Sequence, residues 1–139
     1  MMQLPPISLD AGWVCEYFEL RPDLYEFAKD VLVSSLAAWT FDRIRSENWA
    51  AWLRRRFTLE PLDTCVQYYL YIDTAPANAR IYVNNRHVAD YIPPGPDDPP
   101  FELDITADVA LGENMLAFRV ECDAPGCFSG VRLQPVPCD

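Results

Sequence analysis

Aromatic and cationic side chains alternate with aliphatic ones along two predicted strands. The alternation places Tyr69 and Tyr71 on one face of the first strand, and Arg80 and Tyr82 on the corresponding face of the next. An exposed aromatic ring can stack on the apolar face of a sugar, while neighbouring polar groups bind the hydroxyls. We therefore expect these residues to form one outward row that is a candidate carbohydrate site. The alternative is that a second sheet or a helix covers the row.

A proline-rich loop offers a second group of candidates. Five prolines lie within the segment 91–100, and their restricted φ angles favour a rigid shape. Tyr91 supplies a ring, and Asp97 and Asp98 supply carboxylates suited to sugar hydroxyls or to a structural Ca²⁺. Nothing else in the sequence indicates a cation, so we expect neither a cofactor nor a metal site. The alternative role of the loop is that of a stiff connector.

A third group combines tryptophans with arginines. It comprises Trp39, Trp49, Trp52 and the run 54–56. Alternation puts Arg54 and Arg56 on the same strand face as Trp52, with the arginine between them on the other face. Cation–π stacking or pairing with acidic neighbours accounts for the group without a ligand.

Residues that could support catalysis are sparse. His87 is the only histidine, and it follows a predicted hairpin turn, where a solvated side chain is expected. Ser129 lacks the glycine two positions before it that a nucleophile elbow requires. No phosphate-binding glycine motif is present. We expect no enzymatic activity from this chain alone.

The composition narrows the class of protein. The 139 residues match one domain and are half hydrophobic, which argues against disorder. The net charge of −10 disfavours binding to nucleic acid, whose phosphates would be repelled. No apolar run approaches the length of a membrane span, so we expect no membrane partner.

The cysteines and the N-terminus bear on the compartment. The five cysteines are odd in number and follow no zinc-binding spacing, although Cys122 and Cys127 could pair across a loop. The first residues show neither a basic region nor an apolar region typical of a signal peptide. These features predict a cytoplasmic protein with reduced thiols.

The chain reads in two parts, 1–46 and 47–137, which we expect to form a single domain over 1–139. In the first part, 13–20 is a predicted strand, and from Leu24 to Trp39 apolar residues recur at helical spacing. A helix is the favoured interpretation of that segment, and a strand is the alternative.

The second part is β-rich, with the alternation and turn signals of an antiparallel sandwich or barrel. Turns are predicted at Asn84-Asn85 and at 111–114. The predicted strands are 52–59, 66–73, 79–84, 88–92, 101–105, 115–120 and 128–136.

Four segments of this part, in order, resemble the sugar-binding jelly-roll domain at the N-terminus of family 2 glycoside hydrolases. Residues 52–59 (WLRRRFTL) are similar to its W-[YL]-R-R-x-F-x-[LV] strand, and 79–85 (ARIYVNN) to its A-x-[VI]-[WY]-V-N-G hairpin. Residues 101–106 (FELDIT) and 111–120 (LGENMLAFRV) match its F-x-[FL]-D-[IV]-T and G-x-N-x-[LI]-x-[VF]-x-V segments. Asn85 replaces the usual glycine.

The resemblance implies an all-β fold, namely an antiparallel, galactose-binding-domain-like jelly-roll sandwich with one N-terminal helix as a possible addition. It implies no catalytic residue, because the family's catalytic glutamates lie in a (β/α)₈ barrel, which needs about 250 residues. The expected function is that of a non-catalytic carbohydrate-binding accessory domain. The alternative is a structural or protein-interaction domain without a sugar site, whose partner is another protein or a second copy in a homodimer.

Overall fold

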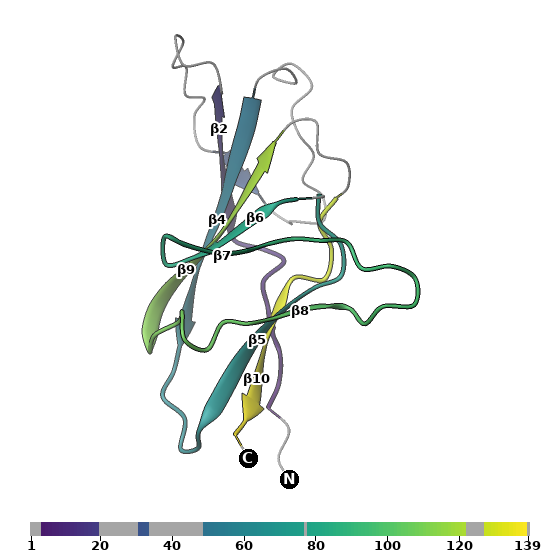
Figure 1. Cartoon of the computed structure of the whole chain (residues 1–139). Coiled ribbons are helices and arrows are strands. Elements are labelled where there is room, and N and C mark those ends of the chain that lie inside the picture. The colour runs from purple at the N-terminus through teal and green to yellow at the C-terminus, as the bar shows by residue number, and fades with distance from the viewer. Residues whose placement is uncertain (1–3, 20–30, 34–48, 77, 122–126, 139) are drawn as a thin grey trace.

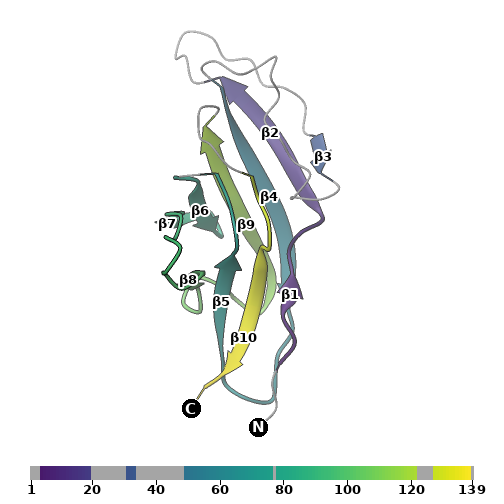
Figure 2. The ribbon, with the colours of Figure 1, turned by 90° about the vertical axis from the view of Figure 1, so that its right-hand side faces the viewer.

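The computed structural model describes residues 4–19, 31–33, 49–76, 78–121 and 127–138. These residues form two sheets in which every pairing of neighbouring strands is antiparallel. The two sheets pack face to face as a β-sandwich, and Figure 2 shows the strands of each sheet side by side. The expected all-β sandwich is therefore confirmed.

The smaller sheet has four strands. Their order is β1 (Ile7–Ser8), β10 (Arg132–Pro137), β5 (Val66–Ile72) and β8 (Phe101–Asp104). The larger sheet has six strands. Their order is β3 (Val31–Val33), β2 (Trp13–Glu19), β4 (Trp49–Leu59), β9 (Gly112–Glu121), β6 (Arg80–Val83) and β7 (Arg86–Asp90). The long strands β4 and β9 form its centre (Figure 1).

The core lies between the sheets and follows from period-two alternation. On β5, Leu70 and Ile72 point inward with no exposed surface, and on β6 Ile81 and Val83 do the same. Trp13 stacks on Phe118, with ring centroids 5.1 Å apart, and Phe118 stacks in turn on Phe128 at the same distance. These rings belong to the single hydrophobic cluster that lies between the sheets.

Two asparagines close the β6–β7 hairpin, as the sequence predicts. Asn84 and Asn85 both have left-handed φ angles, 51° and 67°, which suit the twist of a two-residue hairpin. Asparagine tolerates this conformation better than most residues other than glycine. The replacement of the family's glycine by Asn85 is therefore compatible with the turn.

The predicted helix over 24–39 is wrong where the structure describes it. Val31–Val33 form strand β3, which pairs with β2 through contacts such as Val31 with Cys15. Pairing with a sheet edge overrides the helical spacing of the apolar residues, because strand hydrogen bonds and β-branched side chains favour extended backbone here. The remainder of 24–39 lies outside the described residues, as do Cys122 and Trp39.

The last predicted strand, 128–136, begins later than expected. Gly130 has a φ of 64°, which interrupts the extended backbone, and β10 starts at Arg132. Ser129 instead forms an isolated bridge with Thr74.

A disulfide joins Cys65 and Cys138, so the expectation of reduced thiols is wrong for this pair. Val66 pairs with Pro137 at the end of the β5–β10 ladder, which brings the two flanking cysteines together although 73 positions separate them in the sequence. The positions of the cysteines in the sequence do not indicate this disulfide, because the register of β5 and β10 brings the two residues together. Among the described residues, no helix is long and apolar enough to cross a bilayer.

Candidate ligand-binding surfaces

Tyr69 and Tyr71 lie on the outer face of the four-stranded sheet. Each ring has a cross-strand neighbour on both sides: Tyr71 is opposite Arg132 and Glu102, and Tyr69 is opposite Gln134 and Asp104. We call Tyr69, Tyr71, Glu102, Arg132 and Gln134 the tyrosine face. Both tyrosines are partly exposed, because the inward positions of β5 are taken by its aliphatic residues.

Tyr71 is held in place by its two neighbours. Its hydroxyl donates to Glu102 Oε2 over 2.8 Å, and the Arg132 guanidinium lies over its ring, 5.2 Å from the centroid. The hydrogen bond to Glu102, then desolvation, raises the pKa of Tyr71, since both disfavour the phenolate. The ring is therefore neutral and fixed in orientation at physiological pH.

Tyr69 is less constrained than Tyr71. Its hydroxyl donates to Gln67 Oε1 over 3.3 Å. Gln134, its neighbour on β10, donates from its amide to the carbonyls of Leu4 and Pro135. A cavity of about 360 Å³ adjoins this side of the sheet, and Tyr71, Arg132, Gln134 and Leu4 contribute to its wall.

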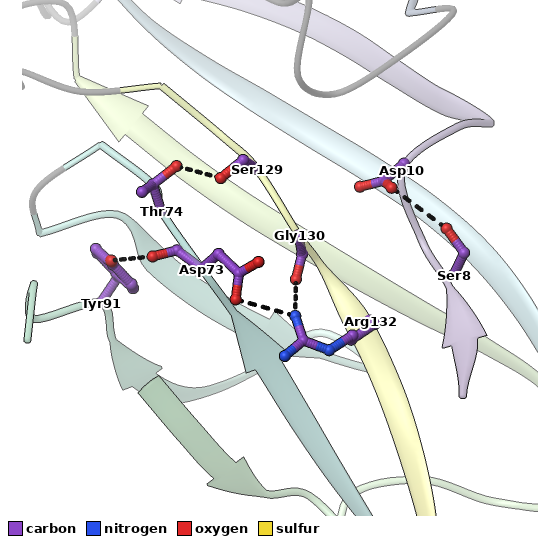
Figure 3. Close-up of polar contacts among 8 residues, drawn as sticks. All are labelled: Ser8, Asp10, Asp73, Thr74, Tyr91, Ser129, Gly130 and Arg132. Atoms are coloured by element: carbon purple, nitrogen blue, oxygen red, sulfur yellow. Dashed lines mark hydrogen bonds and ion pairs between the residues drawn. The ribbon is translucent and has the colours of Figure 1, made fainter. Parts of the chain in front are cut away.

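Arg132 is held in position by Asp73 and Gly130, as Figure 3 shows. Its guanidinium donates to Asp73 Oδ1 over 3.1 Å and to the Gly130 carbonyl over 2.8 Å. A side chain at Gly130 would collide with the Asp73 carboxylate, so only glycine leaves room for this arrangement. The hydroxyls of Thr74 and Ser129 pair beside it over 2.6 Å.

The predicted row of four residues is divided between the two sheets. Tyr69 and Tyr71 are on β5 of the smaller sheet, whereas Arg80 and Tyr82 are on β6 of the larger one. All four point away from the core, and the outer faces of the two sheets look in opposite directions. The expectation of one continuous row is therefore wrong. Alternation determines whether a side chain faces inward or outward, but strand pairing determines which sheet it belongs to.

Tyr91 is buried rather than exposed, with 2% of its surface accessible. Its ring packs against Phe101 at a centroid distance of 5.1 Å, and its hydroxyl points to the Asp73 carbonyl at 3.4 Å. Burial raises its pKa. Backbone bonds explain the inward turn: Tyr91 donates to the Ala79 carbonyl and accepts from the Asn78 amide.

The proline-rich segment between β7 and β8 protrudes from the sandwich in Figure 1. Asp97 and Asp98 are exposed there. The Asp98 carboxylate accepts from the Gly95 amide over 2.8 Å, and the Asp98 amide donates to the Gly95 carbonyl. Asp98 thus closes a turn. Within the described ranges, no group of three or more His, Cys, Asp or Glu side chains is arranged to hold a metal.

The outer face of the six-stranded sheet carries a second aromatic group. The rings of Trp52 and Tyr82 meet edge to face with centroids 4.9 Å apart, and Tyr82 also contacts His87 at 5.1 Å. Arg54 lies over Trp52, 5.0 Å from its centroid, as the alternation predicted. We call Trp52, Arg54, Arg80, Tyr82 and Arg119 the arginine–aromatic face.

Arg55 points to the other side of β4, again as predicted. Its Nε donates to the Ala11 carbonyl over 2.6 Å, and an Nη donates to the Arg56 carbonyl over 2.8 Å. Partial burial lowers its pKa. Arg55 therefore secures the loop before β2.

Sequence reasoning missed three members of the tyrosine face: Arg132, Glu102 and Gln134. Their outward positions were visible in the alternation of the predicted strands. The alternation does not indicate the order of the strands, and it is this order that places β10 and β8 on either side of β5.

Comparison with protein-family models and with curated proteins gave no match. Solved structures do match. A family 2 glycosyl hydrolase from Bacteroides cellulosilyticus aligns over 96% of this chain at 23% identity, with a TM-score of 0.61. An FMN-binding β-glucuronidase from Faecalibacterium prausnitzii aligns over 96% at 19% identity, with a TM-score of 0.67. A β-glycosidase from Bacteroides vulgatus aligns over 96% at 14% identity, with a TM-score of 0.63.

The match covers only a part of each of these proteins. The chain spans 21%, 22% and 20% of their respective lengths. At such low identities the likeness concerns the fold. The chain therefore has the fold of a β-sandwich segment of family 2 glycoside hydrolases.

Proposed function

We propose that this chain is a carbohydrate-binding domain without catalytic activity of its own, and that the tyrosine face is its binding site. The observation that carries the proposal is the cross-strand arrangement of Tyr69 and Tyr71 between polar partners on β10 and β8. Two rings on one strand face, spaced about 7 Å apart by two residues of strand rise, provide a platform for one or two sugar rings.

The polar groups around the rings suit sugar hydroxyls. Gln67 and Gln134 supply amides, Glu102 supplies a carboxylate and Arg132 a guanidinium, all within the same outward surface. Because Tyr71 is already held by Glu102 and Arg132, binding requires little further ordering of its ring. The Tyr69 hydroxyl donates to Gln67 Oε1, and its partly exposed ring is the second stacking partner.

The charge of the tyrosine face favours neutral sugars. Glu102, Asp104 and Asp73 are exposed carboxylates along this surface, and the guanidinium of Arg132 beside them is already paired with Asp73. A uronate would meet more negative than positive charge here. We therefore expect neutral hexosides to bind better than glucuronides.

The lowered pKa of Asp104 argues against a hydrolytic role for the carboxylates on β8. Glu102 and Asp104 are two residues apart on one strand face, and a glycosidase uses two carboxylates roughly 5 to 9.5 Å apart. A general acid, however, needs a raised pKa, and hydrogen bonds from Thr106 lower the pKa of Asp104. Spacing alone does not make this pair catalytic.

The proposal is tested by titrating the chain with neutral galactosides, glucosides and mannosides, alongside glucuronides, and following binding by calorimetry. We expect saturable binding of a neutral sugar at about millimolar affinity or better, abolished in Tyr69→Ala and weakened in Tyr71→Ala. Tyr82→Ala is the matched control, because it removes the same ring from the opposite face. Absence of binding across the panel by a protein with a normal thermal melt would contradict the proposal.

A further inference from the structure

The wall of the cavity beside the tyrosine face differs in chemistry from one end to the other. Strand β10 provides most of this wall, and its outward positions run Arg132, Gln134 and Val136, because the positions between them are buried. Register puts Arg132 beside Tyr71, whereas Pro137 lies at the far end of β10. The cavity is therefore polar and aromatic toward Tyr71 and apolar toward Pro137.

Leu4 completes the apolar end of the cavity. It lies in the wall, and its carbonyl accepts a hydrogen bond from the Gln134 amide over 2.9 Å. Because β1 pairs with β10, the N-terminal segment runs alongside β10 in Figure 2. The side chains of Leu4 and Val136 are both only partly buried. An apolar group in the cavity would remove more of their surface from water.

A second cavity, of about 210 Å³, borders the apolar end. Its wall includes Leu4 and Pro135, and both residues also line the first cavity. It extends toward the end of β4, where Ile7, Leu59 and Leu62 contribute apolar side chains. The apolar end of the first cavity thus continues into further apolar surface.

The polar end has hydrogen-bonding groups left for a sugar. Both side-chain hydrogen bonds of Arg132 use Nη1, and both of Gln134 use Nε2. Within the residues that the structure describes, Nε and Nη2 of Arg132 and Oε1 of Gln134 therefore remain for hydroxyls. Tyr69 is the cross-strand neighbour of Gln134, so its ring lies beside these groups.

The cavity is longer than one sugar ring. The six residues of β10 span about 16 Å, at about 3.3 Å for each step along a strand. The volume of about 360 Å³ is within the range of about 300 to 1,000 Å³ that is usual for small-molecule sites. A pyranose ring held next to Tyr71 would leave the apolar end unfilled.

We propose that the ligand of the tyrosine face is a neutral glycoside with an apolar aglycone. Its sugar lies against Tyr71, Arg132 and Gln134, and its aglycone lies against Leu4 and Val136. This inference rests on the proposed sugar-binding function and names the class of ligand within it. The sugar hydroxyls gain hydrogen bonds only at the polar end, and the aglycone leaves water only at the apolar end, so the two ends fix the orientation of the ligand. An alkyl chain and an aryl group both have the required chemistry.

The test compares methyl, phenyl and octyl β-D-glycosides of glucose, galactose and mannose by calorimetry, with each octyl glycoside below its micelle-forming concentration. For a sugar whose methyl glycoside binds, we expect the phenyl or the octyl glycoside to bind about fivefold to thirtyfold tighter. Burial of about 40 to 80 Å² of apolar surface predicts this gain, at about 25 cal/mol per Å². A larger gain for phenyl identifies an aryl aglycone and a larger gain for octyl an alkyl aglycone, and either result supports the proposal.

The double variant Leu4→Asn/Val136→Thr removes the apolar end. The carbonyl of residue 4 can still accept from Gln134, and threonine keeps the β-branched shape of valine. We expect the ratio of octyl-glycoside to methyl-glycoside affinity to fall toward one in this variant. Leu111→Asn is the matched control, because Leu111 is exposed and lies outside the wall of this cavity. The gain from the aglycone should persist there.

Equal affinities of the wild type for methyl, phenyl and octyl glycosides would overturn this inference and leave the sugar site standing. An affinity ratio that stays as high in the double variant as in the wild type would also overturn it. So would binding of 1-octanol as tightly as an octyl glycoside, since the sugar would then contribute nothing. Absence of binding by every glycoside would refute the sugar site itself, and this inference with it.

Discussion

The side chain of Asn84 donates from Nδ2 to Oδ1 of Asn114 over 3.0 Å, which ties the β6–β7 hairpin to the start of β9. Asn84 also donates to the Asp108 carbonyl and accepts from the Met115 amide. Asn114 is 2% exposed, and its own amide bonds the backbone of Ala110 and Gly112. Two asparagines therefore satisfy backbone polar groups where the β6–β7 hairpin, the loop before β9 and the start of β9 meet.

Asn84→Gly separates the side-chain role of this residue from its backbone role. Glycine keeps the left-handed φ but removes three hydrogen bonds, so we expect a loss of about 2 to 3 kcal/mol in the free energy of unfolding. Asn85 has a similar left-handed φ but makes none of these three hydrogen bonds, so Asn85→Gly should change the free energy of unfolding by less than about 0.5 kcal/mol. Urea denaturation of both variants measures the difference, and equal stabilities would refute the assigned role.

The Cys65–Cys138 disulfide should stabilise the chain by closing a long loop. Removing a cross-link between residues 73 positions apart frees the unfolded chain, and we expect a loss of about 4 kcal/mol in the Cys65→Ser/Cys138→Ser variant. Treatment of the wild type with reductant should reproduce this loss. Cys127→Ser is the control, because that exposed thiol lies outside the disulfide. A reductant-insensitive melting temperature would show that the bond is not formed.

Asp104 should make the folded state sensitive to acid. The Thr106 hydroxyl and amide donate to its carboxylate, which lowers its folded pKa below the usual 3.8. A depressed pKa contributes stability that is present above the unfolded pKa and is lost as the pH falls through the folded pKa. The contribution thus disappears below about pH 4. In Asp104→Asn the free energy of unfolding should depend less on pH in that range, as measured by denaturation at several pH values. If the variant shows the same pH dependence as the wild type, the hydrogen bonds from Thr106 are absent.

Gly130→Ala should disturb the tyrosine face without touching its members. The new methyl group would displace Asp73 and, with it, the guanidinium of Arg132. Alanine at a φ of 64° is also strained by about 1 to 2 kcal/mol. We expect lower stability and weaker sugar binding. Gly112→Ala is the control: it is strained similarly, at a φ of 91°, but its added methyl group meets open space away from Arg132. Equal sugar binding by both variants would argue against a role for Asp73 in positioning Arg132.

The strands of 47–137 were predictable because each has one face against the core. On β5 and β6, period-two alternation of aliphatic residues gave the inward positions correctly. The turn at Asn84-Asn85 was also predictable, since few residues accept two successive left-handed φ angles. The segment 24–39 was harder, because an apolar run in a strand at a sheet edge can mimic helical spacing, as Val31–Val33 show.

The sequence by itself determined the β-sandwich class, the inward and outward sides of most strands, and the residue types available on the surface. Only the tertiary structure decided which outward residues are neighbours. Tyr71 joins Arg132 and Glu102, and Tyr82 joins Trp52 and Arg54, because β5 and β6 pair with partners in different sheets. Strand order and register depend on long-range hydrogen bonding and packing between segments distant in sequence. A local pattern of residues carries no information about those pairings.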